Sequence, residues 1–115
     1  MWKRAHAHII AVRDVTNRFP RSGYASLKSQ LTRAVESIAF TIVEGSGAAT
    51  RKEFARFLDM SIKSASETEY QLQLACDYSV LGLAEWKALT DETVEIRKML
   101  CGLRSKVIEA DREPE

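Results

Sequence analysis

The stretch that decides the fold is VEGSGAAT, residues 43–50, which separates two long segments of helical periodicity. Its Gly45-x-Gly47 pair, with Ala49 one place early, nearly matches the glycine-rich fingerprint that binds a dinucleotide phosphate. That fingerprint needs a strand before the glycines and a parallel sheet beneath them, and the sequence offers neither. We therefore interpret this stretch as the end of a helix, with Gly45 or Gly47 in the left-handed conformation that a Cβ disfavours.

The segment after the glycines begins with a predicted capping box. In it the Thr50 hydroxyl accepts a hydrogen bond from one free backbone amide, and the Glu53 carboxylate accepts from another. The first helical turn also leaves backbone amides free beside Arg51 and Lys52. An anion-binding site at this helix start is therefore the alternative to a purely structural turn.

Four segments carry apolar or small residues at intervals of three and four, the spacing of one helix face. No run of alternating β-branched residues predicts a strand, and short connectors make neighbouring helices antiparallel. We predict an all-α, antiparallel, up-down-up-down four-helix bundle, with residues 1–115 as a single domain around one core. The predicted stripes are Trp2, Ala5, Ile9, Val12, Thr16 and Phe19, ended by Pro20; Leu27, Leu31, Ala34, Val35, Ile38 and Ile42; Phe54, Leu58, Ser61, Ala65, Thr68, Leu72 and Cys76; and Trp86, Leu89, Thr93, Ile96, Leu100, Leu103 and Val107.

Several classes of function lack their sequence patterns. No apolar run approaches the ~18 residues of a membrane span and no signal peptide is recognisable, so we expect a cytoplasmic protein without membrane contact. Cys76 and Cys101 have no metal-ligand spacing and are expected to be buried, reduced thiols. Neither His6 nor His8 follows a glutamate by three, as a di-iron bundle requires, and both are expected to be at the surface or partly buried. We therefore expect no metal, no cofactor and no enzymatic activity.

Positive charge is concentrated in the first third of the chain. The net charge is +1, but residues 1–33 hold seven basic residues against one acidic residue, Asp14. This asymmetry predicts either an anion-binding surface or attraction between oppositely charged helices or subunits. No aromatic platform for stacking bases is evident, so any nucleic-acid binding should have little sequence specificity. The candidate nucleic-acid-binding residues are Lys3, Arg4, Arg13, Arg18, Arg21 and Lys28, with Arg51, Lys52 and Arg56 as a second group.

Bulky apolar residues also project away from the predicted core, which is typical of a surface that binds a partner. We therefore expect self-association through a surface that includes Phe40, Val43, Met60, Tyr70 and Leu74. Charged residues accompany this surface, and we interpret them as ion pairs within or between subunits; the competing interpretation is an active site. This predicted polar network consists of Arg33, Glu36, Glu44 and Glu67.

Matching motifs of one family run in order through nearly the whole chain. They are Trp2 with Thr16-x-x-Phe19-Pro20, Leu27-x-Ser29-Gln30-Leu31-x-Arg33-Ala34, Ser37-Ile38, Ile42-x-Glu44-Gly45-x-Gly47, Glu53-Phe54-x-Arg56-Phe57-Leu58, Ser64-x-x-Glu67-x-Glu69-x-Gln71-Leu72 and Met99-Leu100-x-Gly102-Leu103. With these motifs the chain resembles the bacterial 23S rRNA-intervening-sequence proteins, or S23-type proteins. It departs from them locally: where the family commonly has Pro, Asn, Ala, Arg and Gly, this chain has Ala39, Thr41, Val43, Ala48 and Lys63.

The resemblance implies a bundle that assembles as a ring, typically a homopentamer, and that has no established enzymatic activity. It also implies an origin in reading frames inserted in ribosomal RNA genes. Related pentameric bundles assist reverse transcriptases and bind nucleic acid through a basic surface. The leading hypothesis is therefore a ring-forming, non-enzymatic bundle that binds RNA or DNA. The alternative is a protein-interaction adaptor without affinity for nucleic acid.

Overall fold

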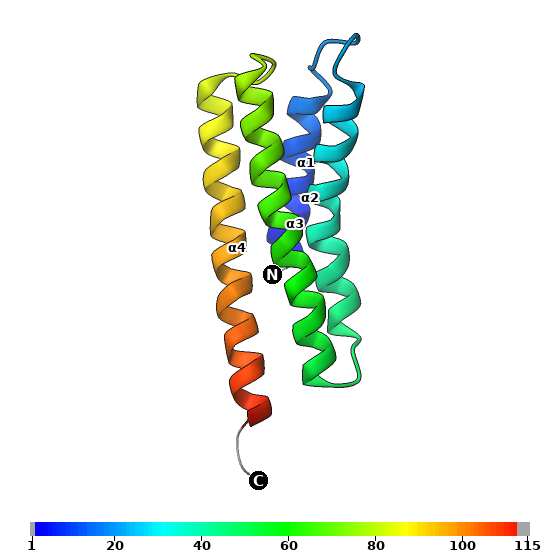
Figure 1. The fold of residues 1–115 in the computed structure, drawn as a ribbon, viewed down its shortest axis with the longest axis vertical. Coiled ribbons are helices and arrows are strands. Elements are labelled where there is room, and N and C mark those ends of the chain that lie inside the picture. The colour runs from blue at the N-terminus through cyan, green and yellow to red at the C-terminus, as the bar shows by residue number, and fades with distance from the viewer. Residues whose placement is uncertain (1, 113–115) are drawn as a thin grey trace.

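Four helices make up nearly all of the protein in the computed structural model, which describes residues 2–112 and the side-chain surroundings of residues 2–110. No strand occurs between residues 2 and 112. Each helix packs against its neighbours in the sequence, and the first also packs against the last, so the four enclose one core (Figure 1). The prediction of an all-α four-helix bundle is confirmed. The helices are α1 (Trp2–Thr16), α2 (Ala25–Ser46), α3 (Arg51–Asp77) and α4 (Leu83–Arg112).

Contacts between the helices show that neighbours run in opposite directions. Near the start of α2, Gln30 Oε1 accepts from Gln71 Nε2 at 3.0 Å, and further along α2 Ser37 bonds Ser64 at 2.8 Å. Partner numbers thus fall along α3 as they rise along α2. The ion pairs that join α4 to α1 and to α3 follow the same reversed order.

The two ends of the bundle carry different connectors. Residues 17–24 and 78–82 form the connectors at one end, which we call the tyrosine end because it contains Tyr24 and Tyr78. Residues 47–50 form the connector at the other end, which we call the glycine end. The tyrosine end is uppermost in Figure 1, and α1 begins about halfway along the bundle.

The buried face of α1 differs from the predicted stripe. Ala5, His8, Val12, Val15 and Phe19 are buried at a regular spacing of three and four, whereas Ile9 is half-buried and Trp2 is 51% exposed. The register of α1 between α2 and α4 turns His8 inward. The expectation that His8 lies at the surface or is partly buried was therefore wrong, because the buried face of α1 passes through His8 and not through Ile9. The predicted stripe of α2 is buried along its whole length.

Close packing between α2 and α3 explains the first of the two glycines that follow α2's apolar stripe. Gly45 is still within α2, and Gly47 after it has a φ of −94°. A Cβ at Gly45 would lie 2.8 Å from the Cβ of Phe57 and 3.0 Å from the ring of Phe54. The prediction of a left-handed glycine at this turn was wrong: Gly45 is required because α3 approaches its α-carbon too closely for a side chain.

The start of α3 matches its predicted cap in part. The Thr50 hydroxyl accepts from the Glu53 backbone N–H at 3.1 Å, as expected. No return bond from the Thr50 N–H to the Glu53 carboxylate occurs in the described part of the chain. Both cysteines are free thiols, but Cys76 is only half-buried and Cys101 is exposed, so the prediction that they are buried was wrong. Cys101 directly follows the buried Leu100 and thus points away from the core.

Candidate nucleic-acid interface

The candidate nucleic-acid-binding residues lie in three separate places on one chain. Lys3 and Arg4 are at the start of α1, about halfway along the bundle. A second group, Arg13, Arg18, Arg21 and Lys28, lies toward the tyrosine end, and Arg51, Lys52 and Arg56 lie at the glycine end. The 22 residues of α2 separate the two ends by about 33 Å. A single chain therefore does not gather these residues into one patch.

Two of these cations are already bound to carboxylates on α4. The Arg4 guanidinium makes a two-pronged contact with Glu92, with Nε to Oε2 at 2.7 Å and Nη2 to Oε1 at 2.9 Å. Nη2 of Arg18 lies 2.6 Å from Oε2 of Glu85. Paired in this way, Arg4 and Arg18 connect α1 and its following turn to α4, and their charge is largely neutralised.

Three further cations contact other parts of the protein. The Lys3 ammonium lies 6.0 Å from the Trp2 ring centroid, and the Arg56 guanidinium lies 5.7 Å from that of Phe57. Arg51 donates to the Ala110 carbonyl oxygen at 3.4 Å, which joins the start of α3 to the last turns of α4.

The cations without a carboxylate partner in the described chain include Arg13, Arg21 and Lys28. Arg21 and Lys28 line the same hollow of about 330 Å³ at the tyrosine end, together with Asn17 and Tyr24. No acidic side chain lines this hollow. Because their charge is not neutralised by the protein, Arg21 and Lys28 are the best placed of the candidates to bind an anion.

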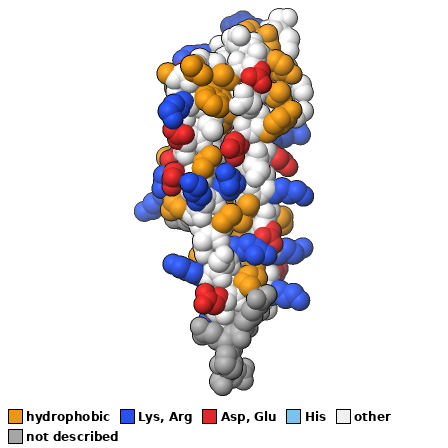
Figure 2. All heavy atoms as spheres, turned by 60° about the vertical axis from the view of Figure 1, so that its left-hand side comes forward, with side chains coloured by type: hydrophobic (Ala, Val, Ile, Leu, Met, Phe, Trp, Pro, Cys, Tyr) orange, Lys and Arg blue, Asp and Glu red, His pale blue; other side chains and the backbone are white. Residues whose placement is uncertain are grey.

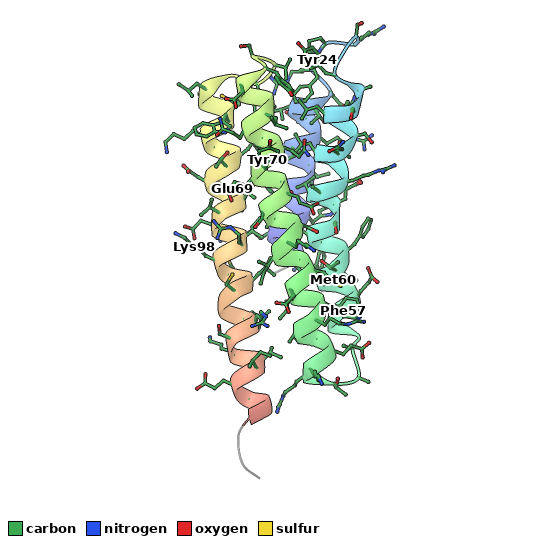
Figure 3. All side chains as sticks on the ribbon, in the orientation of Figure 1. Tyr24, Phe57, Met60, Glu69, Tyr70 and Lys98 are labelled. Atoms are coloured by element: carbon green, nitrogen blue, oxygen red, sulfur yellow. The ribbon has the colours of Figure 1, made fainter. Side chains whose placement is uncertain are left out.

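A second hollow, of about 510 Å³, is also lined by Tyr24 and by residues of α2 and α3. Its lining includes Tyr78, and the two tyrosine rings are 6.4 Å apart between centroids and tilted by 45°. Figure 3 shows Tyr24 at the tyrosine end of the bundle. This pair was not predicted from the sequence, since the two residues are far apart in the chain. The sequence does indicate that both tyrosines lie beside turns, because Tyr24 follows Gly23 and Tyr78 precedes Ser79.

Two residues with positive φ hold these tyrosines in place. Gly23, immediately before Tyr24, has a φ of 91°, and Ser79, immediately after Tyr78, has a φ of 62°. The end of α3 is a Schellman motif: the Ser79 N–H donates to the Cys76 carbonyl and the Val80 N–H to the Ala75 carbonyl, each at 3.0 Å. Glycine is the usual residue where Ser79 stands, so this position has a conformational cost.

The outward orientation of four predicted interface residues is confirmed. Phe40 and Tyr70 are each 62% exposed, Val43 is 54% exposed and Met60 is 42% exposed. Figure 3 shows Met60 and Tyr70 well separated along α3. Tyr70 lines a hollow of about 320 Å³ between α3 and α4, so it does not share a patch with Phe40 on α2.

Leu74 does not belong to this exposed set. It is half-buried, packs against the core and lines the hollow that contains Tyr24 and Tyr78. The prediction that Leu74 points away from the core was wrong, because it faces the seam between α2 and α3, where its side chain is partly covered.

The predicted polar network forms no ion pair within one described chain. Arg33 and Glu67 line a common hollow of about 530 Å³, which adjoins the tyrosine hollow through Gln30 and Gln71. Ion pairing instead occurs along α4, and Figure 2 shows acidic and basic side chains interspersed over the face formed by α4 and α3. Any pairing of Arg33, Glu36, Glu44 and Glu67 between subunits stays a prediction.

The buried histidine forms the one histidine–hydroxyl pair in the described chain. His8 Nε2 lies 2.7 Å from Thr93 Oγ1, and the Thr93 hydroxyl donates to the Leu89 carbonyl at 2.7 Å. Nε2 of His8 must therefore carry the proton and donate it. Burial lowers the pKa of His8 below its usual value, although the nearby Glu92 opposes the shift and Arg4 adds to it. Because Thr93 is fully buried, this pair cannot reach a substrate and serves to join α1 to α4.

Two further properties concern the described part of the chain. No group of three or more His, Cys, Asp or Glu side chains there is arranged so that it could hold a metal ion. None of the four helices combines the length and the apolar character that crossing a membrane requires.

The fold and surface define a small four-helix-bundle protein with cation-lined and aromatic hollows at one end. The chain belongs to the 23S rRNA-intervening sequence protein family, whose model matches residues 1–102. A crystal structure of a protein of unknown function from the S23 ribosomal protein family of Bacteroides thetaiotaomicron is similar, with a TM-score of 0.84 and 21% identity. The match covers 90% of this chain and 96% of that one, and at this identity it concerns the fold. A search among curated proteins found no significant match.

Proposed function

We propose that this protein is a cytoplasmic, non-enzymatic bundle that assembles as a homo-oligomer, with a pentamer favoured, and binds RNA or DNA with little sequence specificity. The observation that carries the proposal is the hollow at the tyrosine end, where Arg21 and Lys28 face solvent without an acidic neighbour in the lining. Phosphate groups are the natural counterions of such a site. The family and the similar structure are both named for ribosomal components, which agrees with an RNA ligand.

Assembly supplies the affinity that one chain lacks. Two unpaired cations bind a phosphate backbone weakly, because each neutralised phosphate contributes only a small, salt-dependent increment. Several copies held in a ring act on one strand together, so that binding of the second and later sites is intramolecular. The exposed Phe40, Val43 and Met60 are the residues through which we expect the copies to associate.

Fluorescence anisotropy with a labelled strand of about 15 nucleotides and with its duplex tests the proposal at about 50 mM and about 200 mM salt. Both forms should bind at the lower salt concentration, and binding should weaken as salt rises. Replacing Arg21 and Lys28 by glutamate should abolish binding of both forms. The matched control replaces Lys52 and Arg56 by glutamate at the glycine end and should have a clearly smaller effect. Failure of the wild-type protein to bind at low salt would exclude the function.

The second candidate function is a protein-interaction adaptor, and the outward-facing Phe40 and Met60 favour it. In that case the oligomer forms but has no affinity for either nucleic acid, and the Arg21 and Lys28 variants behave as the wild type does. The anisotropy measurement therefore separates the two candidates directly.

Light scattering tests the assembly. The Phe40→Glu variant should give monomers or insoluble protein, because a charge would replace an apolar contact between copies. The control is Leu83→Glu, which changes a residue that is 72% exposed but lies outside the proposed interface. An unchanged mass for Phe40→Glu would show that this residue is not in an interface.

A further inference from the structure

The cap positions of two helices are occupied by tyrosines whose side chains make no capping hydrogen bond in the described part of the chain. Tyr24 is the N-cap residue of α2 and makes no side-chain capping hydrogen bond, although serine, threonine, aspartate and asparagine are strongly preferred there. Tyr78 is the C-cap residue of α3, is 53% exposed and precedes Ser79 in its costly conformation. Local helix stability therefore does not account for either tyrosine. What the two share is the hollow that they line together.

The floor of this hollow combines apolar and amide groups. Leu27 and Leu74 contribute aliphatic surface. Gln71 Nε2 donates to Gln30 Oε1 at 3.0 Å, and Gln30 Nε2 donates to Ser26 Oγ at 3.3 Å. Each amide nitrogen keeps one further N–H, and the Gln71 carbonyl oxygen accepts no bond from the described residues. A flat ring that entered the hollow would meet aromatic rings on its face and both donors and acceptors at its edge.

The charge around Tyr24 fits a ligand with an attached anion. Tyr24 forms a wall of both hollows, the aromatic one and the one that contains Arg21 and Lys28. No carboxylate lines either of them. A nucleotide has a flat base and a phosphate joined through one sugar, so its two parts match two hollows that share one lining residue, Tyr24.

We propose that the hollow lined by Tyr24 and Tyr78 binds one unpaired nucleobase of a nucleic-acid strand, with the adjoining phosphate beside Arg21 and Lys28. This inference rests on the proposed function and specifies its ligand as single-stranded. A base within a duplex is stacked on both faces and paired at its edge, so it cannot occupy the site without leaving the helix. Stacking on tyrosine tolerates any base, whereas the amides of Gln30 and Gln71 provide a modest preference.

The test compares three probes: a single strand, its duplex, and the same strand carrying abasic sites in place of its bases. Wild-type protein should bind the single strand more tightly than the other two. The Tyr24→Ser variant places a favoured capping residue at the start of α2, so its fold should be retained or stabilised. It should nevertheless bind the single strand roughly 5- to 100-fold more weakly, while its binding of the duplex and the abasic strand stays unchanged.

Tyr78→Ala should behave in the same way, and Tyr70→Ala is the matched control, since this exposed tyrosine lies on the same helix but outside the hollow. Equal losses for the single strand and the abasic strand would overturn the base site and leave the proposed function intact. A preference of the wild-type protein for the duplex over the single strand would also overturn the base site. Absence of any binding by the wild type would overturn both proposals.

Discussion

The half of the bundle at the tyrosine end has four helices, whereas the half at the glycine end has three. The cause is the length of α1, which has 15 residues against 30 for α4, or about 22 Å against about 45 Å. Along α4, Leu89, Thr93, Ile96 and Leu100 are buried, but none of the described residues 101–110 is. The same helical stripe continues through both halves, so its burial depends on whether a fourth helix covers it.

This difference separates two roles within one small fold. Leu58 and Ile42 are buried in the three-helix half, so α2 and α3 have buried residues in both halves, whereas α4 is buried only in the four-helix half. The end of the four-helix half carries the tyrosine hollow and the hollow that contains Arg21 and Lys28. In the three-helix half, α2 and α3 pack closely at Gly45. The apolar residues of α4 in this half are only partly buried. Stability should therefore be greatest in the half that also supports the proposed site.

The largest expected effect comes from truncating the same residue type in the two halves. Leu100 is fully buried, whereas Leu103, one turn further along α4, is half-buried. Leu100→Ala should lower the free energy of unfolding by about 2–5 kcal/mol, because it leaves a cavity in an enclosed core. Leu103→Ala should cost less than about 2 kcal/mol. Urea denaturation measures both, and equal losses would mean that another chain covers Leu103 in solution.

The next largest effect on stability is expected from replacing one glycine in each of two different helices. Gly45→Ala should destabilise the protein by about 1–3 kcal/mol, because the added Cβ would collide with the Cβ of Phe57 and push α2 from α3. Gly102→Ala on α4, where a Cβ meets nothing within 4 Å, should instead stabilise by about 0.5–1 kcal/mol. Thermal unfolding of the two variants should thus shift in opposite directions. A neutral Gly45→Ala would show that α2 and α3 can separate without cost.

The pH dependence of stability should report on the contact between α1 and α4. The pKa of His8 in the folded protein is below its usual value of 6.5, so the unfolded chain takes up a proton first as the pH falls below about 6.5. Stability should be constant above that pH and decline below it, by no more than about 1.4 kcal/mol per pH unit. Glu92, whose pKa Arg4 lowers from 4.5, loses its contribution only at a lower pH.

Urea midpoints between about pH 7.5 and about pH 5.5 measure this decline. The His8→Gln variant keeps a donor for Thr93 but does not titrate, so its stability should stay nearly constant over this range. His6→Gln changes an exposed histidine and should retain the decline. A wild-type protein with constant stability over the range would show that His8 does not remain neutral on folding.

The smallest expected effect concerns the turn that follows Tyr78. Ser79→Gly removes a Cβ from a residue with positive φ and should stabilise the protein by up to about 1 kcal/mol. Ser105→Gly, on an exposed helical position, should destabilise by roughly 0.5 kcal/mol. Differential scanning calorimetry should resolve the opposite signs, and a loss at Ser79 would mean that its side chain has a stabilising contact.

Much of the fold was predictable because its signals are local. The stripe of α2 and the Thr50 cap depend on residues within a turn or two of one another. The role of Gly45 was misassigned because its steric demand comes from Phe57, on the next helix. His8 was misplaced for a related reason, since the direction in which a helix face points depends on the helices beside it.

The candidate site was less predictable than the fold. The basic residues could be counted, but the sequence did not indicate that Glu92 and Glu85 neutralise Arg4 and Arg18 while Arg21 and Lys28 lack such partners. Tyr24 and Tyr78 come together only when two antiparallel pairs of helices place their connectors at one end.

By itself the sequence determined four amphipathic helices and their order, because a helical repeat of 3.6 residues is recorded in neighbouring residues. The tertiary structure alone decided which polar groups are paired, which half of the bundle is enclosed and which aromatic rings meet. These outcomes depend on the lengths of the helices and on their relative register. If one helix shifts by one turn, about 5.4 Å, each of its side chains meets a different residue on the neighbouring helix.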